Sequence, residues 1–420
     1  MTTELKLAMG TRSSVGVTSC QVCDSDNLKL ILFLGYLPPV NRMNEIGSEI
    51  LEQPSYPAHV LMCQNCNLVQ LGCIVDPKIL FPPEYPYTSS TTRILRENFT
   101  ELSQESVKLF SLKKEDLILD IGSNDGNLLS NFKNNHRVLG VTPEDIGKIA
   151  IEKGIPTIID YFTSEVADKI VGEYGRVKMI TATNVFAHME NINSIVEYIK
   201  KILTDDGVFM CEVHYLKSLV EKLQYDTIYH EHMRYYSLNS LKYLLNSHDF
   251  DIVFAKEIPT HGGSLRIYAS RKGKHPININ VQQLLESEKN IVMSEERLAR
   301  FREEVMLSKV KLYALILKIK NEGGKICGIS APSRASTLIN YIGLNEMIVS
   351  YIVEVQGSHK IGKFVPGTII PVVKESILFE DQPEYAILFS WHIADEIIPK
   401  LRANGYKGKF IVPLPEPHIV

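Results

Sequence analysis

Residues 118–129, ILDIGSNDGNLL, decide the fold of the central part of this 420-residue chain. Residues 117–121 are expected to form a buried strand, and Gly122 and Gly126 bracket the turn into the helix that should follow. The dinucleotide-binding fingerprint has the same layout, but this chain carries Asn124 in place of its second glycine. Because that glycine lets a pyrophosphate approach the backbone, the turn favours a ligand without phosphate there, such as S-adenosylmethionine.

The predicted cofactor site is built around this turn. Asp120 at the end of the strand is placed for the cationic amino-acid part of S-adenosylmethionine, and Gly122 leaves room for a close approach to the backbone. An ordinary strand–helix turn of another α/β protein is the alternative, since glycine patterns are permissive. The predicted cofactor-binding residues are Asp120, Gly122, Ser123, Asn124, Asp125, Gly126, Glu144, Asp160 and Asn184.

The pattern around this turn predicts an α/β protein of three units, covering residues 1–80, 81–275 and 276–420. Strands at 138–141, 177–182 and 207–213, with helices between them, predict a parallel sheet, and IPTHGG at 258–263 should join two further strands as an antiparallel hairpin at its edge. One long amphipathic helix is expected from 276 to about 321, followed by a second α/β pattern.

Two Cys-x-x-Cys pairs lie in the first unit, Cys20 with Cys23 and Cys63 with Cys66. Four thiolates at this spacing predict a tetrahedral zinc site that holds a small β module together. Disulfides are the alternative. Residues 1–10 lack a basic region followed by a long apolar run, so we expect a cytoplasmic, reducing setting that favours zinc.

Composition and charge limit the classes of molecule that this chain is expected to bind. The net charge of -4 and the pI near 6.3 give no electrostatic footprint for nucleic acid, and no apolar run is long enough to predict a membrane span. We therefore expect a small-molecule substrate, no membrane and no obligate protein partner.

Several motifs together resemble a known family, the zinc-containing sugar C-methyltransferases that act on nucleotide-linked 4-keto deoxysugars. The resemblance rests on the two cysteine pairs, EYPYTSS, DIGSNDGNLL, YHEHMRYYS, GGSLRIY and the stretch from KIGKFVPGTIIPV to LFSWHIADEI. It implies an N-terminal zinc-binding β module, a central class I methyltransferase (Rossmann-like) domain and a C-terminal Rossmann-like α/β domain enclosing a sugar nucleotide. It further implies S-adenosylmethionine as methyl donor and a structural zinc ion in deoxysugar biosynthesis.

Two positions depart from the family pattern. The family has an acidic residue closing the second strand for the cofactor ribose, whereas this chain has Thr142 there and Glu144 two positions later. The family also shows a GAPAKG-like turn in its C-terminal domain, where this chain reads SAPSRAST. Glu144 is thus the candidate for the ribose, and the nucleotide specificity can differ.

The segment YHEH carries the expected chemistry. A ketone at C-4 of the sugar acidifies the neighbouring C–H bond, so a neutral imidazole can remove that proton, and by resemblance this base is His232. Tyr229, with Tyr85 or Tyr87, could donate to the enolate oxygen, while Glu231 would orient the imidazole or hold a sugar hydroxyl. One alternative is that His230 and His232 are ordinary loop residues. Another is that they share a metal with Glu212 or His214.

The C-terminal unit supplies candidates for the rest of the substrate. Ser333 and Arg334 open a helix after a strand, where helix amides and an arginine favour phosphate; a simple capped helix is the alternative. The predicted substrate-binding residues are His230, Arg266, Ser333, Arg334, Trp391 and His392. Epimerisation or elimination on the same scaffold, and sugar-nucleotide binding without catalysis, remain the alternative functions.

Overall fold

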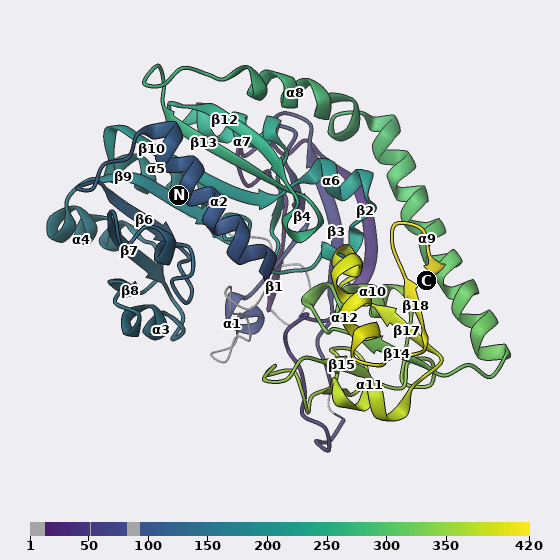
Figure 1. Cartoon of the computed structure of the whole chain (residues 1–420). Helices are drawn as coiled ribbons and strands as arrows, with labels where there is room; N and C mark the ends of the chain where they lie inside the picture. Colours follow the sequence, from purple (N-terminus) through teal and green to yellow (C-terminus); the bar gives the residue numbers. More distant parts are fainter. Residues whose placement is uncertain (1–12, 51, 82–92) are drawn as a thin grey trace.

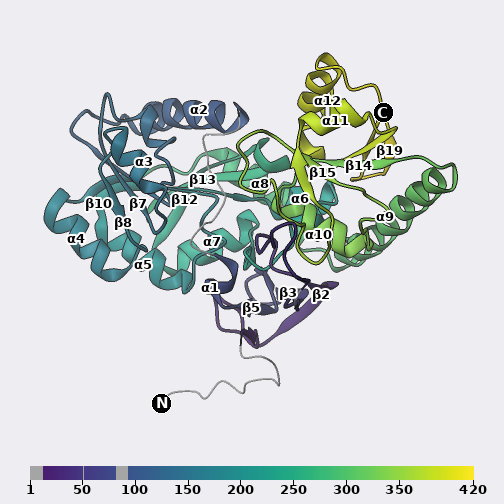
Figure 2. The ribbon, with the colours of Figure 1, turned by 90° about the horizontal axis from the view of Figure 1, so that it is seen from below.

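The structure, a computed structural model, describes residues 13–50, 52–81 and 93–420 (Figure 1). Seen from below, the ribbon divides into a methyltransferase-type sheet with its helices, a C-terminal α/β part, and a small β module that lies against both (Figure 2). No helix in the described ranges is long and apolar enough to cross a membrane.

The central sheet has seven strands in the order β12-β13-β10-β9-β6-β7-β8. Neighbours among β6 to β10 run parallel, and β13 is antiparallel to both β10 and β12, which confirms the predicted edge hairpin. This is the strand order of a class I methyltransferase. The strands are β6 (Leu117–Ile121), β7 (Arg137–Thr142), β8 (Thr157–Ile159), β9 (Val177–Thr183), β10 (Leu203–His214), β12 (Phe250–Ile258) and β13 (Ser264–Arg271).

Helices cover both faces of this sheet (Figure 1). All five residues of β6 are buried, as a central parallel strand requires. The associated helices are α2 (Arg93–Phe110), α3 (Gly147–Glu152), α4 (Ser164–Tyr174), α5 (Ile192–Ile202), α6 (Leu216–Glu221) and α7 (Leu238–Ser247).

The helix expected directly after Gly126 is absent, and a single 3-10 turn, η2 (Leu129–Asn131), stands there. The side chain of Ser130 donates to the Gly126 carbonyl, and Asn131 donates to the carbonyls of Asn127 and Leu128. Short polar side chains that bond to nearby backbone compete with regular helix. The local sequence NLLSN therefore closes a turn where the glycine pattern alone predicts a helix.

The N-terminal module contains a two-stranded sheet of β1 (Ser14–Gly16) and β5 (Cys73–Val75) and a four-stranded sheet in the order β11-β4-β3-β2, followed by α1 (Pro77–Leu80). Its outer strand β11 (Arg234–Tyr235) comes from the YHEHMRYY segment, far along the chain, and pairs with β4 (Val69–Leu71). The other strands are β2 (Leu28–Leu37) and β3 (Tyr56–Cys63). The cysteine module and the predicted catalytic segment thus share one sheet.

The C-terminal part contains a six-stranded sheet in the order β16-β15-β14-β17-β18-β19, parallel apart from β19. Three helices, α10 (Ser333–Ile342), α11 (Ser376–Asp381) and α12 (Ala394–Ala403), connect its strands. The strands are β14 (Ile326–Ile329), β15 (Ile352–Glu354), β16 (Val372–Lys374), β17 (Tyr385–Leu388), β18 (Lys409–Val412) and β19 (His418–Ile419).

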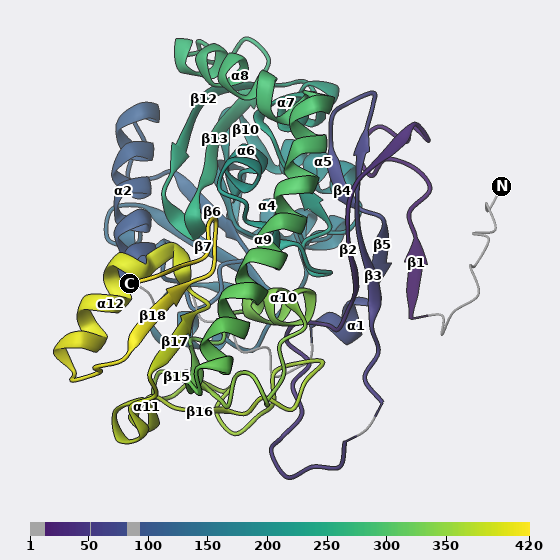
Figure 3. The ribbon, with the colours of Figure 1, turned by 90° about the vertical axis from the view of Figure 1, so that its right-hand side faces the viewer.

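The single long helix expected after residue 276 is two helices, α8 (Ile279–Val292) and α9 (Glu295–Asn321). Ser294 caps α9, because its hydroxyl accepts a hydrogen bond from the amide of Arg297 at 3.1 Å. Figure 3 shows α9 running from α8 towards the C-terminal sheet. The buried stripe of α9 includes Phe301, Val305, Leu312 and Ile316.

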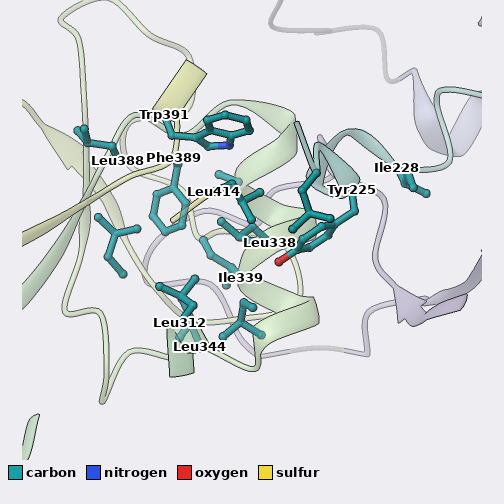
Figure 4. Packing of buried hydrophobic residues seen from close by; sticks show 14 of the residues in the cluster. Tyr225, Ile228, Leu312, Leu338, Ile339, Leu344, Leu388, Phe389, Trp391 and Leu414 are labelled. Carbon is teal, nitrogen blue, oxygen red and sulfur yellow. The ribbon is translucent and has the colours of Figure 1, made fainter. Parts of the chain in front are cut away.

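One hydrophobic core joins the three parts. Leu32 and Val60 of the N-terminal module, Tyr225 and Ile228 of the segment before β11, and the C-terminal residues belong to the same buried cluster. Figure 4 shows Tyr225 near Leu338, with Ile228 farther along the same segment. The segment leading to YHEH is therefore packed between parts of the chain that are distant in sequence.

Candidate functional site: a cysteine cluster, a cofactor turn and a histidine cluster

The four cysteine sulfurs lie within 4.8 Å of one another. The distances are 3.4 Å between Cys20 and Cys66 and 3.5 Å between Cys23 and Cys63, and all four thiols are free of disulfides. A tetrahedral zinc ion with bonds of about 2.3 Å separates its sulfurs by about 3.8 Å, so the cluster fits zinc with little adjustment.

The backbone supports thiolates in this cluster. The amide of Val22 donates to the sulfur of Cys20, and the amide of Asn65 donates to the sulfur of Cys63. The hydrogen bond from Cys66 lowers the pKa of Cys20 to about 5, whereas the same hydrogen bond raises the pKa of Cys66 and burial raises that of Cys63, so without a metal Cys20 is the favoured thiolate. Zinc bound by four thiolates keeps no open position for a substrate, and its role here is to hold the module together.

The turn after β6 leaves no room for side chains at its two glycines. Gly122 adopts φ +77°, and a Cβ atom there would lie 2.3 Å from Cγ1 of Val185. Gly126 adopts φ +76°, and its Cβ would lie 2.7 Å from Cδ1 of Ile155. Asn124 has the left-handed φ of +50°. The hydroxyl oxygen of Ser123 is buried without a hydrogen-bond partner among the described residues.

The other predicted cofactor residues lie at the carboxyl ends of neighbouring strands, where α/β sheets bind ligands. Asp120 is 2% exposed and accepts a 2.7 Å hydrogen bond from the hydroxyl of Thr181, and burial raises the pKa of its carboxyl to about 7. Its carboxyl thus lies beneath the turn and joins β6 to β9.

The remaining candidates surround that turn. Asp125 is buried and accepts from Lys153 at 3.2 Å. Burial raises the pKa of Glu144, while Asp160 is exposed and its amide donates to the carbonyl of Thr142. Asn184, with φ +57°, follows β9 and its amide donates to the carbonyl of Glu212.

A cluster of aromatic rings, most of them imidazoles, surrounds His232. Its ring centroid lies 4.2 Å from that of Tyr229, 4.9 Å from that of His188 and 6.2 Å from that of His214. The ring of His261 lies 6.3 Å from that of His214. The side chains of this histidine cluster are partly exposed.

The sequence analysis missed His188 and His261, and it considered His214 only as a metal ligand. The available signal was positional, because His214 ends strand β10 and His188 and His261 follow the ends of β9 and β12. His261 also has a left-handed φ of +54° next to two glycines, a strained conformation of the kind found at functional sites.

The hydrogen bond of His232 fixes its tautomer. Nδ1 lies 2.9 Å from the carbonyl oxygen of Thr227, and a carbonyl can only accept, so Nδ1 carries the proton and Nε2 carries the lone pair. Burial and the neighbouring imidazoles of His188 and His214 hold the pKa of His232 well below its ordinary value. His232 is therefore neutral at pH 7 and competent to accept a proton. Burial raises the pKa of Tyr229 well above its ordinary value, which keeps its hydroxyl a donor.

His230 lies outside this histidine cluster. It is 1% exposed, its ring packs 5.7 Å from that of Tyr56, and its Nε2 lies 3.4 Å from the carbonyl oxygen of Pro57. Within the described ranges, the four cysteines form the only group of three or more candidate metal ligands. The alternative of a metal held by His230 and His232 is therefore wrong for the described residues, and direct substrate contact by His230 is not favoured.

Arg266 is likewise in a different place from the one expected. Its side chain has no exposed surface and bonds to Glu212 at 2.6 Å, to Glu101 at 2.6 Å and to Glu105 at 2.9 Å. Asn98 accepts a further hydrogen bond from it at 2.8 Å. The prediction that Arg266 binds substrate is corrected, because the buried Glu212 and the partly exposed Glu101 and Glu105 already accept from its guanidinium. Glu212, which was proposed as a metal ligand, forms an ion pair with Arg266 in the same cluster.

The C-terminal candidates surround a buried acid that the sequence analysis missed. Asp226 is fully buried, and both of its oxygens accept from Arg334 at 2.8 Å. Trp391 donates to it at 2.8 Å, and Arg334 lies 2.9 Å from Nδ1 of His392. The predicted role of Arg334 as a phosphate ligand is corrected, because its guanidinium is 6% exposed and already paired.

Two further candidates connect the parts of the chain. Glu231 accepts from Asn41 at 2.8 Å, and Ser333 donates to the same Asn41 at 3.2 Å. The imidazole of His232 is oriented by the Thr227 carbonyl, the role that the sequence analysis gave to Glu231. Tyr85 and Tyr87 lie outside the described residues.

Three protein families match successive parts of the chain. "Putative zinc binding domain" matches residues 20–81, "Methyltransferase domain" matches 91–254, and "C-methyltransferase C-terminal domain" matches 259–415. C-methyltransferase NovU of Streptomyces niveus is 30% identical over 415 residues, which cover 96% of this chain and 97% of that protein.

Solved structures match the middle of the chain at low similarity. The PH0226 protein of Pyrococcus horikoshii OT3 is 17% identical with a TM-score of 0.36, covering 47% of this chain and 98% of its own. An S-adenosylmethionine-dependent methyltransferase of Clostridium acetobutylicum ATCC 824 is 11% identical with a TM-score of 0.35, covering 44% and 94%. The similarity to NovU extends over nearly the whole chain and its three parts match in order, so this protein belongs to the zinc-binding, S-adenosylmethionine-dependent C-methyltransferase family.

Proposed function

We propose that this enzyme methylates C-3 of a nucleotide-linked 4-keto-6-deoxysugar in the cytoplasm. The observation that carries the proposal is the state of His232, a neutral imidazole whose Nε2 carries the lone pair, within the cluster of aromatic rings that surrounds it. Carbon methylation requires a carbanion equivalent, and a proton next to a ketone is one that an imidazole can remove. The resemblance of the chain to sugar C-methyltransferases supplies the sugar and the nucleotide.

The proposed reaction begins with proton transfer to His232. Nε2 takes the proton from C-3, the electrons of that C–H bond form the C-3–C-4 double bond, and the carbonyl oxygen becomes an enolate. The Thr227 carbonyl, which accepts from Nδ1, stabilises the imidazolium that results. The hydroxyl of Tyr229, beside the ring of His232, donates to the enolate oxygen.

Carbon–carbon bond formation completes the methyl transfer. When bound, S-adenosylmethionine supplies an electrophilic methyl group and leaves as the neutral thioether. The enolate electrons form the new bond at C-3, and the carbonyl at C-4 is restored. The turn of Gly122 and Gly126 would hold the donor, and burial keeps the pKa of His232 low enough for its imidazole to stay neutral.

The assay that tests this function is incubation with S-adenosylmethionine and a panel of nucleotide-linked 4-keto deoxysugars, followed by the mass of each product. We expect one added methyl group with one nucleotide series. A product of unchanged mass but altered configuration would support epimerisation, loss of water would support elimination, and binding without turnover would support a non-catalytic sugar-nucleotide-binding protein.

The variant His232→Asn tests the base. Asparagine cannot take the proton, so turnover should fall about 10² to 10⁴-fold with little change in substrate binding. Exchange of the C-3 hydrogen with deuterated water should fall equally. His418→Asn, at an exposed position near the C-terminus, is the matched control. Methylation by His232→Asn within about threefold of wild type would assign the base elsewhere, with Tyr85 and Tyr87 as the next candidates.

A further inference from the structure

The carboxylate of Asp226 is held by the C-terminal part of the chain. It lies in the short turn η3 (Tyr225–Thr227), which belongs to the segment before β11. Arg334, in the first turn of α10, donates to both oxygens of Asp226 at 2.8 Å, and Trp391 after β17 donates to one of them at 2.8 Å. A buried carboxylate is thus bound by three donors from two C-terminal elements.

The next residue in the chain orients the proposed base. Thr227 follows Asp226, and its carbonyl accepts the hydrogen bond from Nδ1 of His232 at 2.9 Å. The hydroxyl of Thr227 donates back to the carbonyl of Gln224 at 2.7 Å, which closes the turn. A shift of Asp226 therefore moves the peptide group that sets the orientation of the His232 ring.

Arg334 is fixed in one orientation by further contacts within the protein. Its guanidinium lies 4.9 Å from the centre of the Trp391 ring, and its third nitrogen lies 2.9 Å from Nδ1 of His392. Stacking and two parallel bonds fix a guanidinium in one orientation, which a lysine ammonium cannot reproduce. Since each nitrogen of the Arg334 guanidinium has a partner within the protein, it is suited to holding protein groups in place.

We propose that Arg334 and Asp226 form a clamp between the C-terminal and methyltransferase parts that positions His232 for proton removal. The proposal rests on the proposed function, because it needs His232 as the base. Arg334 acts as a positioning residue. It contacts Asp226, whose position fixes the neighbouring Thr227 carbonyl, and this carbonyl sets the orientation of the His232 imidazole. Assembly of the C-terminal part onto the rest of the chain thereby completes the site.

The decisive experiment measures exchange of the C-3 hydrogen with deuterated water, together with kcat and KM, in Arg334→Ala and Arg334→Lys. A misplacement of about 1 Å can cost about 10²-fold in rate, so we expect both variants to lose about that factor in exchange and kcat while KM for S-adenosylmethionine stays within about threefold. Ethylguanidinium added to Arg334→Ala should restore part of the rate. Arg300→Ala, which removes an exposed arginine paired with Glu304, should leave the rate unchanged.

The pH profile separates positioning from a general loss of stability. Opening the clamp admits water around His232, so the acid limb of the exchange rate should move up towards pH 6.5, the ordinary value of an imidazole. A variant that is only less stable would keep the wild-type limb in its folded fraction. Zinc content and circular dichroism establish that the folded fraction is intact.

Several outcomes would overturn the clamp. A rate in Arg334→Lys within about threefold of wild type would do so, and so would an increase in the KM of the nucleotide sugar alone, which would return Arg334 to phosphate binding. If Arg334→Ala fails to fold, Arg334→Lys and Asp226→Asn decide by the same criteria. Full exchange in His232→Asn would instead refute the proposed function, and rescue by ethylguanidinium in that variant would show that the rescue is not specific to the clamp.

Discussion

Replacing Arg266 by methionine should destabilise this enzyme by about 3 to 5 kcal/mol, the cost of leaving a buried carboxylate without its cation. The magnitude follows from the environment of the pair. Neither side chain of Arg266 and Glu212 has exposed surface, and Nε of the arginine lies 2.6 Å from the glutamate oxygen. After the substitution, the Asn98 amide would still donate to Glu212 at 3.0 Å, but the paired cation would be gone. Urea unfolding followed by circular dichroism measures the loss.

Two companion variants test this reasoning. Lys256 contacts Glu101 and Glu105 of the same cluster from a partly exposed position, so Lys256→Met should cost less than about 1 kcal/mol. Arg266→Met combined with Glu212→Gln should recover part of the stability, because the uncompensated charge is then removed. A loss below about 1 kcal/mol in Arg266→Met, together with a raised KM for the sugar nucleotide, would refute the structural role and restore the substrate contact expected from the sequence.

Three further predictions address the metal, the cofactor and acid stability. Cys20→Ser and Cys66→Ser should each lower zinc content and stability together, as measured by elemental analysis and thermal unfolding, and full zinc retention would contradict the four-thiolate site. Gly122→Val should abolish S-adenosylmethionine binding in calorimetry, because even its Cβ would lie 2.3 Å from Val185, and undiminished affinity would remove this turn from the cofactor site. Burial lowers the pKa of His230 to about 4, so the unfolded chain binds a proton that the folded chain does not: stability should fall by up to about 3 kcal/mol between pH 6.5 and about 4 and be unaffected by this group above that range, a slope that His230→Gln should reduce in urea titrations.

The sequence alone determined the features that depend on short stretches of chain. Two residues between the cysteines of each pair place two thiols in one turn, so the zinc module could be predicted from spacing. The strand before Gly122 and the positive φ that this glycine permits are equally local, as is the alternation that predicts a parallel sheet. The turn after Gly126 and the break at Ser294 were missed because side-chain hydrogen bonds, which periodicity does not encode, decided them.

Only the tertiary structure decided what surrounds the base. His188 and His214 reach His232 because strands β9 and β10 end at the same edge of the sheet, and Arg334 reaches Asp226 across 108 positions of sequence. A motif states which side chains are present, but whether an arginine meets a phosphate or a buried carboxylate depends on which distant element packs against it. Arg266 and Arg334 were both assigned to the substrate for that reason, and in both cases desolvation requires the buried cation to find its partner inside the protein.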